Sequence, residues 1–320
     1  TTEIYTLSLH DALPIWAVVD SASELIIEAG TRVFFHNKSL LLVYRGASLK
    51  VLGEPGQEVY FRNDRLDEFY KDLPGQWEGI WLSRGSYGNL IRNAVIQNGN
   101  LGIQVDETET PGQPQLTLLN TRIGNMKTGG LSGNATEISS VNCVIENCGS
   151  YAVALNGGNY SFSHLTIGNF WSVSTRQTPS LVMKNYFLDS GGNIVYVDPT
   201  QMTFLNSVIW GNANEEILID GEGQGTPFQW SFDRCYVRTL RNTSDPLRFA
   251  DCVVNEDPQF LDSSKPILEP DTLSPLLMSG KFSGVDTDIL GRMRNLQTPA
   301  IGAYEPVYPP VFRIRSLYKP

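Results

Sequence analysis

The residues of this 320-residue chain that could do acid–base or metal chemistry gather in two irregular acidic segments. One holds Asp106, Glu107 and Glu109, and the other holds Glu215, Glu216, Asp220 and Glu222. Glycoside hydrolysis needs two or three carboxylates about 5–10 Å apart, and a calcium-assisted elimination needs a carboxylate cluster with a basic residue beside it. Acidic clusters of this kind are more often solvated surface than catalytic or metal-binding sites. The sequence also lacks the spacing of Cys and His residues that binds zinc. We therefore predict no catalytic residue, no metal site and no cofactor.

The segment 61–77 mixes charged and aromatic residues, which suits a loop that binds sugar. Tyr70 and Trp77 are candidate platforms on which a sugar ring could stack. The alternative is that Trp77 packs against the first regular coil while the charged side chains are solvated and paired. Weaker acid–base candidates in the same segment are Arg62, Asp64, Arg65 and Asp67.

A second irregular segment, 170–180, lies where the spacing of the chain's repeat doubles. Trp171, Arg176 and Gln177 are the kinds of side chain that bind carbohydrate by stacking and hydrogen bonding, although Trp171 could equally shield the edge of a coil. The interval of 42 residues between Ile167 and Ile209 predicts one full extra coil in this region.

A repeat in the sequence indicates the strands that must position these segments. An isoleucine is followed two residues later by an asparagine, with isoleucine steps of 27, 22 and 22 residues. This ladder comprises Ile96 and Asn98, Ile123 and Asn125, Ile145 and Asn147, Ile167 and Asn169, and a copy stretched by one residue at Ile209 and Asn212. Apolar residues alternate around each isoleucine, which is the period of a β-strand.

Each period holds about three such runs and no convincing helical pattern, which fits one coil of a parallel β-helix. Like residues then stack into ladders along the axis, and the asparagine suits a sharp corner. Cys143, Cys235 and Cys252 share one inward position and are predicted to be buried free thiols. The outward positions beside the isoleucines stack no two carboxylates on adjacent coils, so we expect the strands to be a scaffold.

Several segments resemble right-handed parallel β-helix repeat proteins of the pectin-lyase-like fold. The sequence 142–147 is similar to their consensus coil, and 25–35 resembles the opening segment of exported or surface proteins of Bacteroidetes. The segments 273–275, 288–292 and 301–305 resemble the closing part of the same proteins. The resemblance implies an all-β, right-handed parallel β-helix and an extracellular or cell-surface location, and it is nearly silent on activity.

The two ends of the chain are expected to differ from the repeat. Residues 6–15 resemble a translated sequencing adapter, so we set 1–15 aside as non-native and expect that any targeting segment is missing. The β-helix is predicted over 16–262, in roughly eight to ten coils. The proline-rich remainder, 263–320, is expected to be an irregular carboxy-terminal cap and tail that protects the open end.

A formal net charge of −10 disfavours nucleic acid and anionic membranes as partners, and no apolar run is long enough to span a membrane. We expect a non-catalytic, exported or cell-surface module that binds a glycan, with an extracellular polysaccharide as the expected partner, through the loops that interrupt the repeat. Two alternatives stay open: a polysaccharide lyase or glycoside hydrolase with a loop-built site, and an adhesin or structural spacer.

Overall fold

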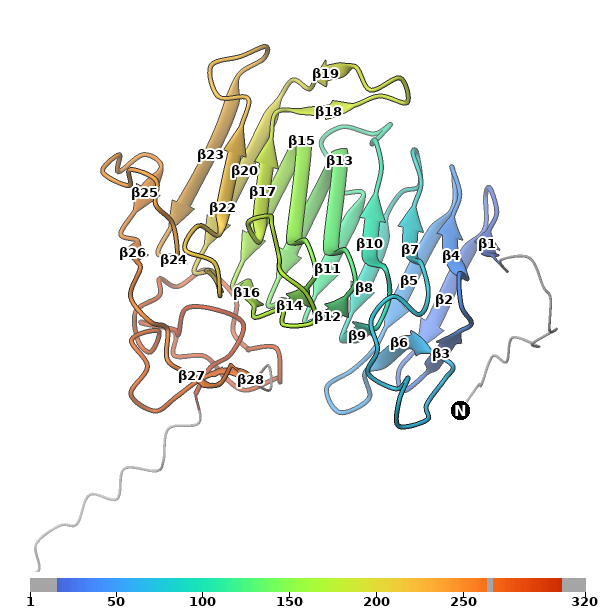
Figure 1. The fold of residues 1–320 in the computed structure, drawn as a ribbon, viewed down its shortest axis with the longest axis horizontal. Coiled ribbons are helices and arrows are strands. Elements are labelled where there is room, and N and C mark those ends of the chain that lie inside the picture. Colours follow the sequence, from blue (N-terminus) through green and yellow to red (C-terminus); the bar gives the residue numbers. More distant parts are fainter. Residues whose placement is uncertain (1–15, 264–266, 307–320) are drawn as a thin grey trace, which may run out of the picture.

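The strands of each coil pair with the equivalent strands of the coils before and after it, so that the chain winds as a solenoid with three faces (Figure 1). The structure is a computed structural model that describes residues 16–263 and 267–306. The segment 1–15, set aside above, lies outside the described residues. All strand pairs between coils are parallel, and no helix occurs among the described residues, so none could cross a membrane.

The first and second faces form one 15-stranded sheet, because two long strands bend from one face into the other. These bent strands are β13 (Gly129–Val141) and β15 (Tyr151–Ser163). The remaining strands of the first face are β1 (Trp16–Val19), β4 (Leu40–Val43), β7 (Gly79–Leu82), β10 (Leu101–Val105), β17 (Leu181–Lys184) and β22 (Ile217–Asp220). Those of the second face are β2 (Glu24–Glu28), β5 (Ser48–Leu52), β8 (Asn89–Arg92), β11 (Leu116–Leu119), β20 (Thr200–Leu205), β23 (Phe228–Asp233) and β25 (Phe249–Ala250).

The third face is a separate 9-stranded sheet with one strand from each coil, within the predicted range of eight to ten. Its strands are β3 (Arg32–Phe35), β6 (Val59–Asn63), β9 (Ala94–Gln97), β12 (Arg122–Met126), β14 (Val144–Cys148), β16 (Thr166–Asn169), β21 (Val208–Gly211), β24 (Tyr236–Val237) and β26 (Val253–Val254). Two antiparallel pairs lie outside the coils: β18 (Tyr186–Leu188) with β19 (Ile194–Tyr196), and β27 (Phe260–Asp262) with β28 (Ile267–Pro270).

The isoleucine ladder has the register that the repeat predicted. Ile96, Ile123, Ile145, Ile167 and Ile209 pair in succession on the third face, and all are fully buried. On the second face phenylalanines stack in the same way, with ring centroids 5.0 Å apart for Phe162 and Phe204 and 4.9 Å for Phe204 and Phe232. Stacking of like residues therefore builds a continuous apolar core along the axis.

The corner asparagines form a hydrogen-bonded chain. Asn98, Asn125 and Asn147 have φ values of 66°, 56° and 46°, the left-handed conformation that asparagine tolerates. The amide of Asn125 donates to Oδ1 of Asn98 at 2.8 Å, and the amide of Asn98 donates to Oδ1 of Asn63 at 2.8 Å. Asn212 is out of this register, because Gly211 is the residue that pairs with Asn169.

The prediction of an extra coil between Ile167 and Ile209 is wrong, because these two residues are direct partners in β16 and β21. The interval holds one strand of the first face, β17, and one of the second face, β20, which is the content of a single coil. The remaining length is taken up by two insertions within one coil, the 170–180 loop and the β18–β19 hairpin. A long interval between repeats therefore marked protruding segments rather than an additional turn.

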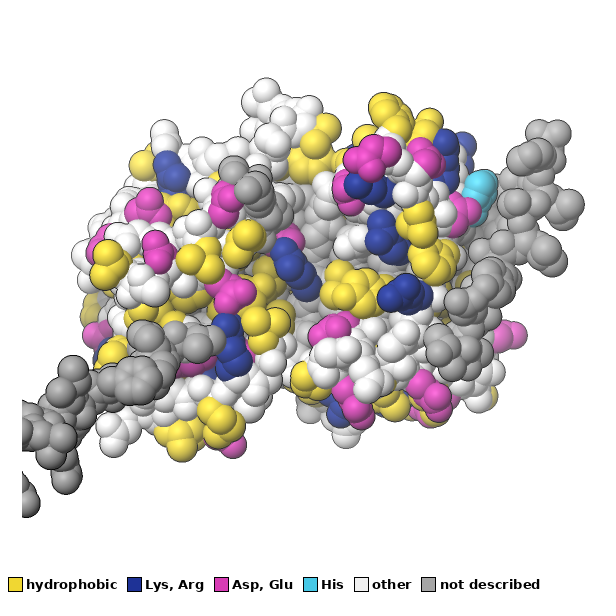
Figure 2. Space-filling model, turned by 90° about the horizontal axis from the view of Figure 1, so that it is seen from below, with side chains coloured by type: hydrophobic (Ala, Val, Ile, Leu, Met, Phe, Trp, Pro, Cys, Tyr) yellow, Lys and Arg dark blue, Asp and Glu magenta, His cyan; other side chains and the backbone are white. Residues whose placement is uncertain are grey.

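The irregular carboxy-terminal segment lies along the outer side of the third face (Figure 1). Leu276 and Ile301 pack with Val208, and the amide of Ala303 donates to Oγ1 of Thr166 at 2.9 Å. Its described contacts are therefore with the side of the solenoid. The sequence had suggested instead that this segment covers the open end. In Figure 2 this side of the molecule is hollowed between the carboxy-terminal segment and the 61–77 loop.

Candidate functional site

A groove runs along the outer side of the first face, under the β18–β19 hairpin. It consists of two hollows of about 650 Å³ and about 750 Å³, and both are lined by Arg84 and Asp106. The groove therefore crosses several consecutive coils, so its length follows the axis of the solenoid. We call it the first-face groove.

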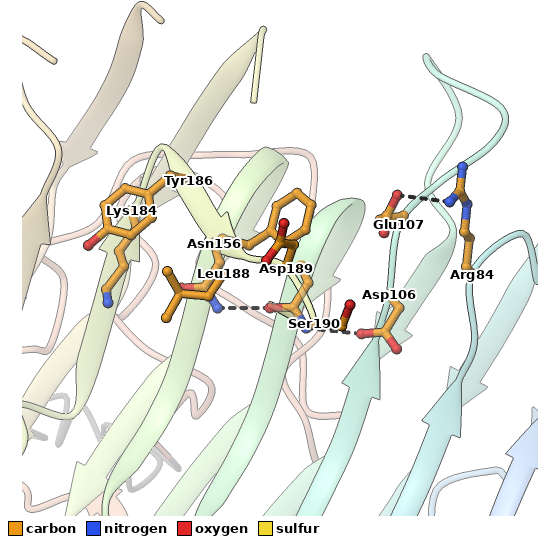
Figure 3. Close-up of a pocket in the computed structure, with 11 residues that line it drawn as sticks. Arg84, Asp106, Glu107, Asn156, Lys184, Tyr186, Leu188, Asp189 and Ser190 are labelled. Atoms are coloured by element: carbon orange, nitrogen blue, oxygen red, sulfur yellow. Dashed lines mark hydrogen bonds and ion pairs between the residues drawn. The ribbon is translucent and has the colours of Figure 1, made fainter. Parts of the chain in front are cut away.

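Its floor is a row of polar side chains joined by hydrogen bonds (Figure 3). The amide of Asn156 donates to Oδ1 of Asn134 at 2.9 Å, and the amide of Asn134 donates to Oδ1 of Asp106 at 2.9 Å. Asp106 also accepts bonds from Nε2 of Gln104 at 3.0 Å and from Nε1 of Trp81. Because each amide is fixed by its neighbour, the floor presents donors and acceptors in set orientations.

Aromatic side chains line the amino-terminal half of the first-face groove. Trp16, Tyr44 and Trp81 lie on three consecutive coils and border the same hollow. The side chains of Trp16 and Tyr44 are about half exposed, at 52% and 48%. Consecutive coils are about 4.8 Å apart, so these rings offer apolar surface in steps along the groove. Large apolar surface beside polar groups suits a ligand with both characters, such as a sugar.

The hairpin β18–β19 overhangs the carboxy-terminal half of the groove (Figure 1). Leu188, Asp189 and Ser190 of this hairpin line the same hollow as Asn156 (Figure 3). Asp189 accepts the backbone amides of Gly191 and Asn193, both at 2.8 Å, and these bonds close the hairpin turn. Hydrogen bonds from Asn193, side chain first, hold the pKa of Asp189 below its usual value.

The carboxylates of the first-face groove are engaged by other groups of the protein. Asp106 accepts the bonds described above, Asp189 closes its turn, and Glu107 pairs with Arg84 at 3.5 Å. A general acid or nucleophile needs a carboxyl group within reach of a substrate and with a pKa matched to its task. Each of these three carboxylates therefore has a partner within the protein.

Trp77 lies in the core, so the prediction that it is a sugar platform is wrong. Its side chain is fully buried, and its ring stacks on Phe35 with centroids 4.2 Å apart. Its Nε1 donates to the backbone oxygen of Gln97 at 2.9 Å. An apolar partner for the ring and an acceptor for the N–H satisfy both parts of the indole, as the alternative interpretation proposed.

The other candidates of the 61–77 loop mostly bond within their own neighbourhood. Arg65 pairs with Asp67 at 3.6 Å, and its guanidinium lies 3.1 Å from the centroid of the half-buried Tyr70 ring. This contact covers one face of the tyrosine that was expected to stack on sugar. Arg62 donates to the backbone oxygen of Lys71 at 3.0 Å, and Asp64 contacts Nδ1 of His36 at 2.8 Å.

In the 170–180 loop, Arg176 is not a surface ligand-binding residue. It forms a salt bridge with Glu216 at 2.5 Å in which the two side chains are only 2% and 0% exposed. Trp171 is also buried, and its Nε1 bonds to Oγ of Ser174 at 3.0 Å. Gln177 alone of these three candidates is exposed, and no candidate of this loop lines the first-face groove. The buried ion pair instead anchors the loop to Glu216, the residue that precedes β22.

Sequence reasoning missed the floor of the groove, although a signal was present. Asn134 and Asn156 are 22 residues apart, the same interval that separates the isoleucines. A search for polar residues at this period outside the Ile-x-Asn ladder would have found them. The overhanging hairpin had no such signal, because the apolar residues 194–197 fit a coil strand equally well.

The comparison with protein families agrees with this architecture. A family described as a right handed beta helix region matches residues 35–171, which span coils from β3 to just past β16. No curated protein matches the sequence. The same parallel pairing continues past the matched region as far as β26. The chain is therefore a right-handed parallel β-helix repeat protein.

Proposed function

We propose that this chain is a non-catalytic carbohydrate-binding module of an exported or cell-surface protein, and that the first-face groove is its binding surface. The observation that carries the proposal is the continuous groove in which a hydrogen-bonded amide floor meets exposed aromatic rings on consecutive coils. An extended ligand with hydroxyl groups and apolar ring faces would use both features along its length. The resemblance of 25–35 to exported proteins supports the location.

Affinity electrophoresis through gels containing soluble neutral β-glucan, xylan or galactomannan tests the proposal. We expect at least one polysaccharide to retard the protein, and Tyr44→Ala to relieve the retardation. Tyr87→Ala is the matched control, because Tyr87 is similarly exposed, at 54%, and does not line the groove. Migration unaffected by all three polysaccharides, or equal retardation of the two variants, would overturn the proposal.

A further inference from the structure

A second hollow, of about 610 Å³, lies on the outer side of the third face between the 61–77 loop and the carboxy-terminal segment (Figure 2). Its floor is the outward side of β9, β12 and β14 and includes Gln97, Arg122 and Glu146. We call it the third-face hollow. It shares no lining residue with the first-face groove, so the two can be tested separately.

The centre of the hollow is an arginine–glutamate pair on adjacent coils. Nε and Nη2 of Arg122 both contact Oε1 of Glu146 at 2.7 Å. The glutamate side chain is only 7% exposed, whereas the arginine side chain is 39% exposed. Gly124 leaves the space that Glu146 fills, because an added Cβ there would lie 2.9 Å from Cγ of the glutamate. The pair is thus built into the floor rather than lying loosely on it.

Two acceptor atoms of this hollow lack a donor. Oε2 of Glu146 and Oδ1 of Asn147 are buried and have no hydrogen-bond partner within the described part of the chain. Leaving a buried acceptor unsatisfied costs about 1–3 kcal/mol. Both residues line the hollow, so a molecule bound there lies next to the side chains that carry the two unsatisfied acceptors.

The lining selects the kind of molecule. Its polar groups disfavour an apolar ligand. Asp72 and Glu146 outnumber Arg122, which disfavours an anion. Among the described residues no group of three His, Cys, Asp or Glu could hold a metal ion. What remains is a neutral ligand that both donates and accepts hydrogen bonds at close spacing, as vicinal hydroxyl groups do.

We propose that the third-face hollow is a second binding site and that it takes a neutral saccharide unit. Hydroxyl groups of the sugar donate to Glu146 and Asn147, while the amide of Gln97 donates to a hydroxyl oxygen. Burial raises the pKa of Glu146 to about 7 against the opposing effect of Arg122. Hydroxyl donors would stabilise the charged form of this carboxylate.

The test uses isothermal titration calorimetry in a Tyr44→Ala background, which weakens the first-face groove alone. The probes are hexasaccharides of β-1,4-linked glucose, xylose and mannose. We expect one of them to bind with residual affinity, and Glu146→Gln to reduce that affinity about tenfold by replacing an acceptor with a donor. Gly124→Ala should act in the same direction, because its methyl group displaces Glu146 and leaves every polar group present.

Glu28→Gln is the control, since Glu28 is an exposed glutamate on β2 outside both sites. Thermal unfolding identifies any variant that has lost its fold. If either Glu146→Gln or Gly124→Ala fails to fold, the other variant still tests the hollow. The proposal is overturned if no hexasaccharide binds in the Tyr44→Ala background, or if binding there is equal in Glu146→Gln, Gly124→Ala and Glu28→Gln. Failure of the first-face groove gives a different result, namely that Tyr44→Ala binds as tightly as the unaltered protein.

Discussion

Glu146 has one carboxylate oxygen held by Arg122 and the other buried without a donor among the described residues. Burial raises its pKa from 4.5 to about 7 in the folded protein, although the nearby guanidinium opposes the shift. In the sequence Arg122 precedes Ile123 and Glu146 follows Ile145, so the two residues lie in different outward rows, one on each side of the isoleucine ladder. The search for stacked carboxylates considered each row by itself. The pair was missed because it runs diagonally, from one row on β12 to the other row on β14.

The raised pKa of Glu146 makes stability depend on pH with a definite sign. Between pH 4.5 and 7 the folded protein binds this proton more strongly than the unfolded chain does, so the free energy of unfolding falls as the pH rises. The loss from this group is about 3 kcal/mol and levels off above pH 7. Denaturant unfolding of the unaltered protein and Glu146→Gln at pH 5 and pH 8 measures it. A stability difference between the two proteins that does not change with pH would contradict this account.

Trp77 fills the core beside Phe35, so its role is in folding. We expect Trp77→Ala to destabilise the protein by about 3–5 kcal/mol through loss of buried surface and the cavity left behind. Chemical denaturation measures the loss, and polysaccharide retardation of the folded fraction should be unchanged. A variant of normal stability that no longer binds would restore the sugar-platform interpretation.

At the scale of elements, the corner asparagines do more than turn the chain. Besides its bond to Asn63, the amide of Asn98 donates to the backbone oxygen of Lys71 at 2.6 Å, and that of Asn125 donates to the backbone oxygen of Asp72 at 2.7 Å. The ladder therefore holds the 61–77 loop against the third face. The repeat revealed the corner, but the attachment joins residues 27 and 53 positions apart, which no local pattern encodes.

Replacement of Asn98 should release the 61–77 loop. Asn98→Gly keeps a backbone suited to φ 66° and loses the amide bonds, whereas Asn98→Ala adds strain of about 1 kcal/mol or more. We expect limited proteolysis to cut both variants within 64–72 faster than it cuts the unaltered protein. Only Asn98→Ala should also lose the further folding stability, about 1 kcal/mol, that the backbone strain costs. Equal cleavage of all three proteins would exclude this role for the ladder.

The carboxy-terminal segment is attached through a buried histidine. Nδ1 of His164 contacts the backbone oxygen of Gly302 at 3.2 Å, and Nε2 contacts Oγ of Ser283 at 3.0 Å. Burial, and then the charge of Arg294, lower the pKa of His164 from 6.5 to about 3. Between pH 6.5 and about pH 3, His164 is protonated in a detached or unfolded chain but stays neutral in the folded chain. The attachment therefore weakens as the pH falls below 6.5.

Hydrogen exchange of 267–306, corrected for the intrinsic effect of pH, tests the attachment. We expect protection of this segment to fall between pH 7 and pH 4.5 by more than that of β13 and β15. His164→Asn is the matched variant, because His164 has the left-handed corner conformation that Asn142 and Asn206 adopt on neighbouring coils. Acid loosening that is equal in this variant and the unaltered protein would rule out the histidine as its cause.

At the scale of the whole molecule, the repeat predicted the architecture because every coil must satisfy the same packing constraint. Stacked positions such as Ile145 and Ile167 recur at a fixed interval, and this interval is visible in the sequence. The binding surfaces were not predicted in the same way. The 61–77 and 170–180 loops drew attention by their composition, yet Trp77, Trp171 and Arg176 proved to be buried. Whether an aromatic ring in a loop faces inward or outward depends on tertiary contacts that the period does not record.

The most direct test of the central claim is a ¹H–¹⁵N NMR titration of the protein with a hexasaccharide of the polysaccharide that retards it. The account predicts saturable shifts of the backbone amides of Trp81, Asp106, Asn134 and Asn156 in the first-face groove, whether or not signals in the third-face hollow also move. Saturable binding that leaves those four amides unchanged would contradict it.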